Sequence, residues 1–140
     1  MALRLRRLFL PMAALLALMG ASCSDDGGGV GATLADFSIT LDANSAEAGE
    51  VTFDVTNEAD QTHEFVVLKT DIAEDQLPTD DAGDVDEAGD PGIELIDEIE
   101  DIAGGATPTL TVNLEAGNYV LICNLPGHYA EGMHASFTVN

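Results

Sequence analysis

The sequence predicts an all-β protein, folded as a sandwich of two antiparallel β-sheets. Short runs of residues alternate between apolar and polar side chains, which is the period-two pattern of half-buried strands. Turn-forming residues such as glycine, asparagine and aspartate separate these runs at close spacing. The 140 residues contain no internal repeat, and they are enough for one domain with a hydrophobic core.

The first strands are predicted within residues 37–41 and 51–56, where apolar and polar residues alternate. In the second run the odd-numbered residues are apolar and should face the core. A third run, residues 65–68, is apolar without interruption, which predicts a strand buried on both faces. His63 lies at the front of that strand and should be held in place by its packing.

Residues 70–106 are harder to interpret and form a long acidic excursion. Residues 79–91 are acidic and glycine-rich, which predicts a solvated loop. Residues 72–77 could form one or two helical turns. Isoleucine recurs at every third position from 93 to 102, which fits a helical stripe. Because isoleucine is β-branched, a kinked strand is an equal alternative there.

The last strands are predicted at residues 107–114, 118–123 and 137–140. The turn signal Glu-Ala-Gly joins the first two of them. The β-branched and aromatic run that follows this turn delivers Cys123 to the end of a strand. The final strand closes the sheet, so the segment after Cys123 should join two adjacent strands.

That segment, residues 123–133, carries a thiol, an imidazole and a thioether at Cys123, His128 and Met133, and is called the ligand loop. A Pro-Gly turn inside it brings His128 back beside the sulfur of Cys123. Copper accepts thiolate and imidazole ligands, and it accepts a thioether as a weak and distant axial ligand. The spacing therefore indicates three of the four donors of a mononuclear blue copper site.

The fourth donor must come from elsewhere in the chain, which has three histidines. His134 directly follows Met133, so its side chain should point away from that of Met133. His63 remains as the second imidazole. We therefore predict that His63, Cys123, His128 and Met133 bind one copper ion.

Other interpretations of these residues are weaker. A single cysteine at a strand end is usually a buried small hydrophobe, and two cysteines in an exported chain suggest a disulfide. Zinc prefers a tetrahedral site without a thioether. A Cys–His nucleophilic pair is possible, but it leaves Met133 and His63 without a role.

The pattern resembles the cupredoxins, the plastocyanin/azurin-like blue copper proteins, over residues 34–140. The residues that carry the resemblance are Asn57, His63-Glu64-Phe65, Tyr119, and the spaced set Cys123-x4-His128-x4-Met133. It implies a Greek-key, cupredoxin-like sandwich and one type 1 copper ion that exchanges single electrons. With no open position on the metal, we expect no enzymatic activity.

The resemblance also implies surroundings for the metal. An edge of His128 should reach the surface within an apolar patch that suits brief docking with redox proteins. From the residues themselves, we expect that the backbone N–H groups of Glu64 and Leu125 can donate to the sulfur of Cys123. The residues expected in the patch are Leu125, Pro126, Ala130 and Tyr129.

Two other functions remain open at this stage. The protein could be an extracytoplasmic copper carrier or buffer that delivers copper to an oxidase, which requires an exchangeable site. It could also be a structural or adhesive lipoprotein whose loop matches the copper pattern by chance. His134 should lie at the surface near the site, either within a partner's footprint or as an ordinary solvated residue.

Charge restricts the possible partners. The chain has 26 acidic residues, and after Arg7 the only basic residue is Lys69. Nucleic acid is excluded as a partner by repulsion. The acidity fits adaptation to a salty medium or attraction to a basic redox partner, such as a cytochrome c, or to a terminal oxidase or reductase. We expect a monomer.

Residues 1–22 are predicted to be a signal peptide, because an arginine cluster precedes a short apolar stretch. The small residues before Cys23 resemble a bacterial lipoprotein signal, although Gly20 stands where leucine is usual. We expect lipidation of Cys23, with ordinary secretion as the alternative. Residues 23–33 would be a flexible tether holding the domain, residues 34–140, at the outer face of the membrane or in the periplasm.

Overall fold

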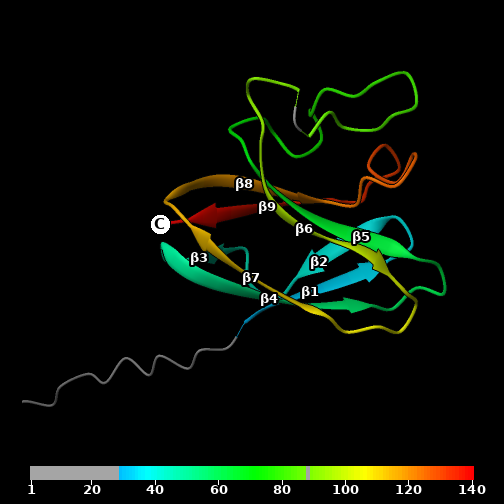
Figure 1. Ribbon diagram of the computed structural model, residues 1–140, viewed down its shortest axis with the longest axis horizontal. Coiled ribbons are helices and arrows are strands. Elements are labelled where there is room, and N and C mark those ends of the chain that lie inside the picture. The colour runs from blue at the N-terminus through cyan, green and yellow to red at the C-terminus, as the bar shows by residue number, and fades with distance from the viewer. Residues whose placement is uncertain (1–28, 88) are drawn as a thin grey trace, which may run out of the picture.

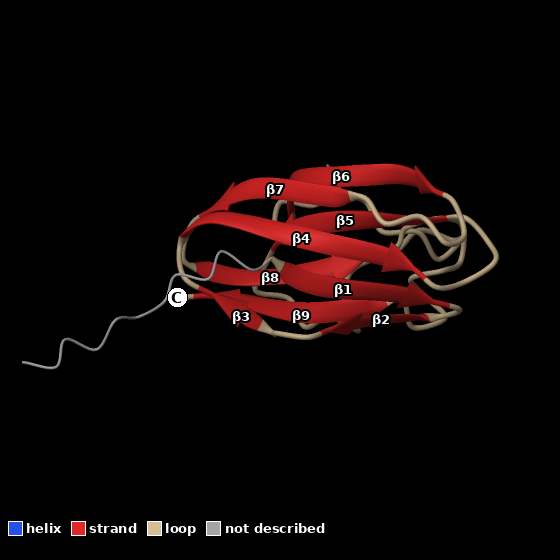
Figure 2. Cartoon of the chain, turned by 90° about the horizontal axis from the view of Figure 1, so that it is seen from below, coloured by secondary structure: helices blue, strands red, loops and turns tan. Residues whose placement is uncertain are grey.

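The protein is a two-sheet β-sandwich with a cupredoxin-like fold, as the sequence predicts (Figures 1 and 2). The structure, a computed structural model, describes residues 29–87 and 89–140. The predicted signal peptide, Cys23 and most of the predicted tether lie outside the described residues. Among the described residues, no helix is long and apolar enough to cross a bilayer.

One sheet has four strands in the order β2-β1-β4-β7, and the other has five in the order β3-β9-β8-β5-β6. The chain passes repeatedly between the sheets, so that strands adjacent in sequence often lie in different layers (Figure 2). The strands are β1 (Val30–Ala35), β2 (Ser38–Leu41), β3 (Ser45–Ala46), β4 (Gly49–Asn57), β5 (His63–Lys69), β6 (Glu94–Ile102), β7 (Thr109–Leu114), β8 (Gly117–Ile122) and β9 (His134–Val139).

The sheets are not purely antiparallel, contrary to the sequence-based prediction. Strand β1 pairs with β4 in parallel, and the short β3 pairs with β9 in parallel. After β2 the chain crosses to the other sheet as β3 before it returns as β4. This crossover lets β4 run beside β1 in the same direction.

Strand β1 begins within the segment predicted to be a tether. Val30, Ala32 and Leu34 alternate toward the core and are 8%, 1% and 0% exposed. Residues 30–33, which the sequence assigns to the tether, are therefore part of the sandwich. The glycine at position 31 gave this stretch the appearance of a linker, although it sits inside a paired strand.

The main core lies between the two sheets. Its centre is aromatic, because the ring of Phe53 lies 5.4 Å from that of Phe65 and 5.3 Å from that of Phe137. These residues come from β4, β5 and β9, so the core joins both layers. The predicted inward side of residues 51–56 is confirmed, since the apolar residues of that run are buried.

Strand β5 is buried on both faces, as predicted. Phe65 and Val67 belong to the main core, whereas Val66 and Leu68 belong to a second cluster on the outer face of the five-stranded sheet. Residues 70–87 and 89–93, together called the overlying loop, cover that outer face. Figure 1 shows this loop in green above β5 and β8.

The predicted solvated loop, residues 79–91, is packed against the sheet at Val85, and two apolar residues that flank this run are buried as well. Leu77 and Val85 are each 5% exposed and Ile93 is 8% exposed. Residues 72–77 form turns rather than a helix. The acidic side chains lie mostly at the surface, so the loop is solvated on one side and packed on the other.

Residues 94–102 are a strand, which decides between the two alternatives left open by the isoleucine spacing. The pairing of β6 with β5 shifts register twice, between His63 and Phe65 and between Val67 and Leu68. At each shift β6 holds one residue more than β5, which is a β-bulge. With these bulges Ile96, Ile99 and Ile102, spaced three apart, all pack against the main core. Ile93 precedes the strand and packs in the second cluster.

Candidate metal centre

The ligand loop connects β8 to β9, which are antiparallel neighbours, as predicted. Cys123 follows β8 directly, and its N–H donates to the carbonyl of Met133 at 3.1 Å. The N–H of Met133 donates to the carbonyl of His128 at 3.1 Å. Gly127 and Gly132 have φ values of 79° and 116°, which other residues rarely adopt, and so allow both bends.

Three predicted donors meet at one point. The Sγ atom of Cys123 lies 3.3 Å from Nδ1 of His128 and 3.8 Å from Nδ1 of His63. The two Nδ1 atoms are 3.2 Å apart. His63 is the first residue of β5. It therefore comes from a strand other than the two that the ligand loop joins, as predicted.

The donor residues are shielded from water, with one exception. His63, Cys123 and Met133 are each 0% exposed, while His128 is half-buried. The thioether residue therefore lies in the main core beside Cys123, with its backbone bonded to both flanking ligands. One edge of the site, that of His128, is the part closest to solvent.

Burial favours the uncharged forms of two of the donors, His63 and Cys123. Burial lowers the pKa of His63, and the neighbouring His128 lowers it further, so the imidazole is neutral and able to coordinate. Burial raises the pKa of the Cys123 thiol, although backbone N–H groups of Glu64 and Leu125 oppose the effect. A thiolate is thus disfavoured there without a positive charge beside it.

Two backbone contacts expected near the sulfur are present. The N–H of Glu64 points to Sγ of Cys123 at 3.4 Å, and the N–H of Leu125 also supports the thiolate. The Glu64 carboxylate makes a contact that the sequence did not predict, because its Oε1 accepts from the N–H of Asn124 at 2.7 Å. Glu64 therefore ties the strand of His63 to the ligand loop.

A buried asparagine fixes the loop before His63. Asn57 is 0% exposed, and its Nδ2 donates to the carbonyls of Gln61 and Ile102, both at 2.8 Å. Its Oδ1 accepts from the N–H of Ala59 at 3.0 Å. With all its polar atoms bonded, Asn57 holds the chain that enters β5 and so sets the position of His63.

The surface around His128 differs in part from the predicted patch. Tyr129 is 6% exposed and does not belong to it, because its ring packs into the second cluster. Phe37 is 46% exposed instead, with its ring edge-on to that of His128 at a centroid distance of 6.4 Å. Its φ of 62° is unusual for a bulky residue and places it in the β1–β2 turn rather than in a strand.

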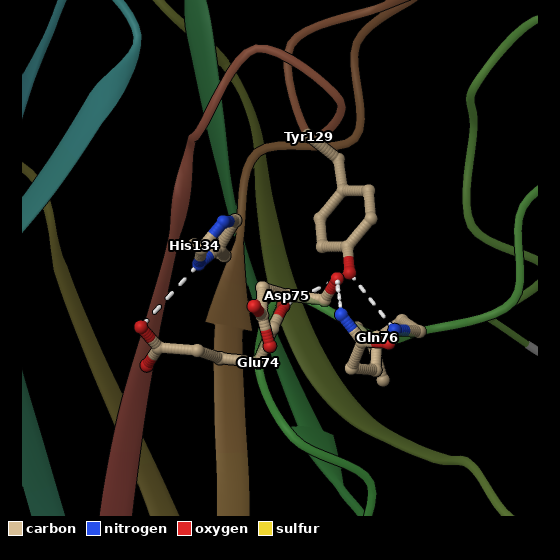
Figure 3. A network of polar contacts seen from close by, with 6 residues as sticks. Glu74, Asp75, Gln76, Tyr129 and His134 are labelled. Atoms are coloured by element: carbon tan, nitrogen blue, oxygen red, sulfur yellow. Dashed lines mark hydrogen bonds and ion pairs between the residues drawn. The ribbon is translucent and has the colours of Figure 1, made fainter.

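The remaining members of the predicted patch vary in exposure. Pro126 and Ala130 are exposed, and Leu125 is half-buried against the main core. His134 lies near the site, but it is not simply solvated. Its Nδ1 is 3.5 Å from a carboxylate oxygen of Glu74, as Figure 3 shows.

The donor set fits copper. Two imidazole nitrogens and one cysteine sulfur converge. Met133 is buried in the same cluster as Cys123 and bonded through its backbone to Cys123 and His128, so its thioether would supply the weak fourth donor that copper accepts. Zinc would need a fourth strong donor in place of that thioether. Among the residues that the structure describes, Nε2 of His63 has no hydrogen-bond partner, and its Nδ1 contacts the other two donors.

Comparison with protein families agrees with this chemistry. The model of copper binding proteins of the plastocyanin/azurin family matches residues 30–140. None of the curated proteins compared matches the chain.

Several solved structures share the fold. Reduced auracyanin from the photosynthetic bacterium Roseiflexus castenholzii is 22% identical, with a TM-score of 0.58 over 79% of this chain and 94% of that one. Auracyanin A, a blue copper protein from Chloroflexus aurantiacus, is 24% identical, with a TM-score of 0.53 over 81% and 100%. Rusticyanin from Thiobacillus ferrooxidans is 22% identical, with a TM-score of 0.55 over 80% and 76%.

Proposed function

The chain belongs to the plastocyanin/azurin family of copper-binding proteins, and we propose that it carries single electrons between redox partners outside the cytoplasm. In this proposal His63, Cys123, His128 and Met133 hold one type 1 copper ion. Copper supplies one-electron chemistry by alternating between Cu(I) and Cu(II).

Each residue has a distinct task. His63 and Cys123 are buried donors whose positions are fixed by Asn57 and by the N–H of Glu64. His128 is the half-buried donor, so its outer edge is the short route between the site and a docked partner. Phe37, exposed beside that edge, gives the partner an apolar contact.

The closed donor set carries the proposal. A copper carrier or buffer needs an exchangeable site, whereas three of the four donor residues here are 0% exposed. A closed site suits electron transfer, because it keeps substrate and water off the metal and limits the change in geometry between oxidation states. The same closure argues against bond chemistry at the metal, and so against an enzyme.

Titration with Cu(II), followed by absorption spectroscopy and voltammetry, tests this function. We expect an intense visible band, reversible one-electron behaviour and slow metal loss. Cys123→Ser should abolish the band, because the charge-transfer donor is removed, and His63→Ala should weaken binding strongly. A colourless, rapidly exchanging Cu(I) site would instead support the carrier function, and a wild-type spectrum in either variant would refute the ligand assignment.

For the partner, we propose a basic redox protein, such as a cytochrome c, drawn by the acidic surface. Electrostatic steering raises association rates by about 10–10³-fold and is screened by salt. Electron transfer to a basic test cytochrome should therefore slow between low and physiological salt. Neutralising Asp80, Asp81, Asp84 and Asp86 together should lower the low-salt rate, whereas rates insensitive to salt would favour adaptation to a salty medium.

For the location, we propose a lipid anchor on Cys23, at the outer face of the cell membrane or in the periplasm. The support is the run of small residues before this cysteine, after an arginine-led apolar stretch. The native protein should partition with membranes, and Cys23→Ala should release it or block its processing. Mass spectrometry that finds an unmodified Cys23 in the mature protein would contradict the anchor.

A further inference from the structure

The residue that follows each of the four proposed ligands makes a polar contact of its own. Successive side chains in extended backbone point in opposite directions, so a residue next to a ligand tends to face away from the metal. Three of these contacts reach the overlying loop, and one joins β5 to the ligand loop. The four residues are Glu64, Asn124, Tyr129 and His134.

Asn124, which follows Cys123, is bonded to the overlying loop on both sides of its amide. Its Oδ1 accepts from the N–H of Val85 at 2.7 Å, and its Nδ2 donates to the carbonyl of Val85 at 2.9 Å. The same Nδ2 donates to Oε1 of Glu87 at 2.7 Å. The side chain thus pairs with the backbone of Val85 much as a neighbouring strand would.

Tyr129, which follows His128, is the second point of attachment. Its hydroxyl accepts from the N–H of Leu77 and donates to the carbonyl of Glu74, both at 2.9 Å (Figure 3). Its ring is buried in the second cluster, together with Leu77 and Val85. Tyr129 is therefore fixed at its ring and at its hydroxyl.

The turn between these two residues is attached as well. The N–H of Gly127 donates to a carboxylate oxygen of Asp84 at 3.0 Å. The overlying loop thus contacts the ligand loop at residues 124, 127 and 129, which flank Cys123 and His128. Those partners lie about 40 to 55 positions away in the sequence.

We propose that the overlying loop is a brace for the metal centre, and that Asn124 and Tyr129 are the positioning residues through which it holds Cys123 and His128. The inference rests on the proposed ligand set. Cu(II) alone favours tetragonal surroundings, so a loosened ligand loop would relax toward them and stabilise Cu(II). Outer residues that orient ligands tune a metal in this way.

The test compares Tyr129→Phe and Asn124→Ala with a matched control, Tyr119→Phe. The Tyr119 hydroxyl donates to the carbonyl of Glu115 at 2.8 Å, and this residue is 2% exposed on the same strand that leads to Cys123. The control therefore removes a buried tyrosine hydroxyl without touching the overlying loop. Asn124→Ala and Tyr129→Phe remove contacts to different residues of the overlying loop. If one variant fails to fold, the other can still be measured.

Two measurements are made on each variant. In metal-free protein, hydrogen exchange at the amides of His128 and Met133 should rise roughly tenfold in both brace variants, because hydrogen bonds that limit opening are lost. In copper-loaded protein, the reduction potential should fall, the visible bands should change in relative intensity, and copper should dissociate roughly five- to tenfold faster. Tyr119→Phe should leave all of these unchanged.

Brace variants that match Tyr119→Phe in exchange, potential, spectrum and copper loss would overturn the proposal, even if they were less stable. The exchange measurement needs no copper. If the wild-type protein forms no blue centre, the proposed function fails, and exchange at His128 and Met133 still decides whether the overlying loop braces the ligand loop.

Discussion

The two hydrophobic clusters of this protein lie on opposite faces of one five-stranded sheet, and they are built differently. The main core is filled from strands of both sheets, with phenylalanine rings at its centre. The second cluster has strand residues of β5 and β8 on one side and the irregular overlying loop on the other. The first sets the fold, and the second sets the surroundings of the ligand loop.

This difference separates stability from site geometry. Loss of packing in the main core removes contacts between the layers, so the whole domain should unfold. Loss of packing in the second cluster frees a loop whose own backbone makes few regular hydrogen bonds, so the sandwich should persist while the ligand loop loosens. Substitutions in each cluster can test this separation.

The largest effect is expected from Phe53→Ala. Phe53 is 0% exposed and touches the rings of Phe65 and Phe137, so its removal leaves a cavity at the centre of the main core. We expect a loss of about 3–5 kcal/mol in the free energy of unfolding. Urea unfolding of the metal-free protein measures it. A loss below about 1 kcal/mol would show that the main core does not set stability.

A smaller effect on stability, but a specific one on the site, is expected from Leu77→Ala in the overlying loop. Leu77 is 5% exposed, so the loss should be about 2–3 kcal/mol or less, since a loop can collapse into the space. Hydrogen exchange in the ligand loop should increase before global unfolding begins.

Leu110→Ala is the control for Leu77→Ala, because Leu110 is 9% exposed in the main core, on β7 of the four-stranded sheet, whereas the overlying loop packs on the five-stranded sheet. It should lower global stability without selective exchange in the ligand loop. Equal exchange in the two variants would mean that the two clusters are not separable.

The same contrast explains which features could be predicted from the sequence. Period-two alternation is a local signal, and it located β2, β4 and β7, although it missed β1. The ligand motif is nearly local as well, since Cys123, His128 and Met133 share one loop. Docking of the overlying loop depends on contacts about 40 to 55 residues apart, and Val85 is a lone apolar residue in an acidic run, without a period to reveal it.

The predicted surface patch around His128 included Tyr129, which is buried, and omitted Phe37, which is exposed. Both errors have a related cause. The alternation of residues 37–41 places Phe37 inside a half-buried strand, but the β1–β2 turn takes it out with a φ of 62°. Tyr129 appeared to be a surface residue because it follows a half-exposed ligand. Leu77 and Val85 of the overlying loop help to bury it, and the sequence did not reveal the packing of that loop.

Met133 belongs to the main core and to the proposed ligand set, so Met133→Leu separates its packing role from its ligand role. Leucine keeps most of the apolar volume, and the free energy of unfolding should change by less than about 1.5 kcal/mol. The reduction potential should rise, because a donor that stabilises Cu(II) is removed, while Met133→Gln should lower it. Voltammetry measures both variants, and an unchanged potential in both would assign Met133 to core packing alone.

The smallest effect is expected at the acidic edge of the second cluster, with Glu87→Gln. Burial raises the pKa of Glu87, and the charges of Glu98 and Glu100 raise it further, against the opposing hydrogen bond from Asn124. A carboxyl group with a raised pKa in the folded state contributes stability that is complete below its unfolded pKa and lost as the pH rises through its folded pKa.

The raised pKa therefore makes Glu87 contribute less stability at pH 7 than at low pH. Glutamine removes the charge and keeps an oxygen that accepts from Asn124, so the melting temperature of the metal-free protein should rise by about 2–4 °C at pH 7. The gain should vanish below about pH 4, where glutamate is protonated in both states. Asp81→Asn removes the same charge from an exposed position of the overlying loop, so a gain there of equal size would assign the effect to net charge rather than to the burial of Glu87.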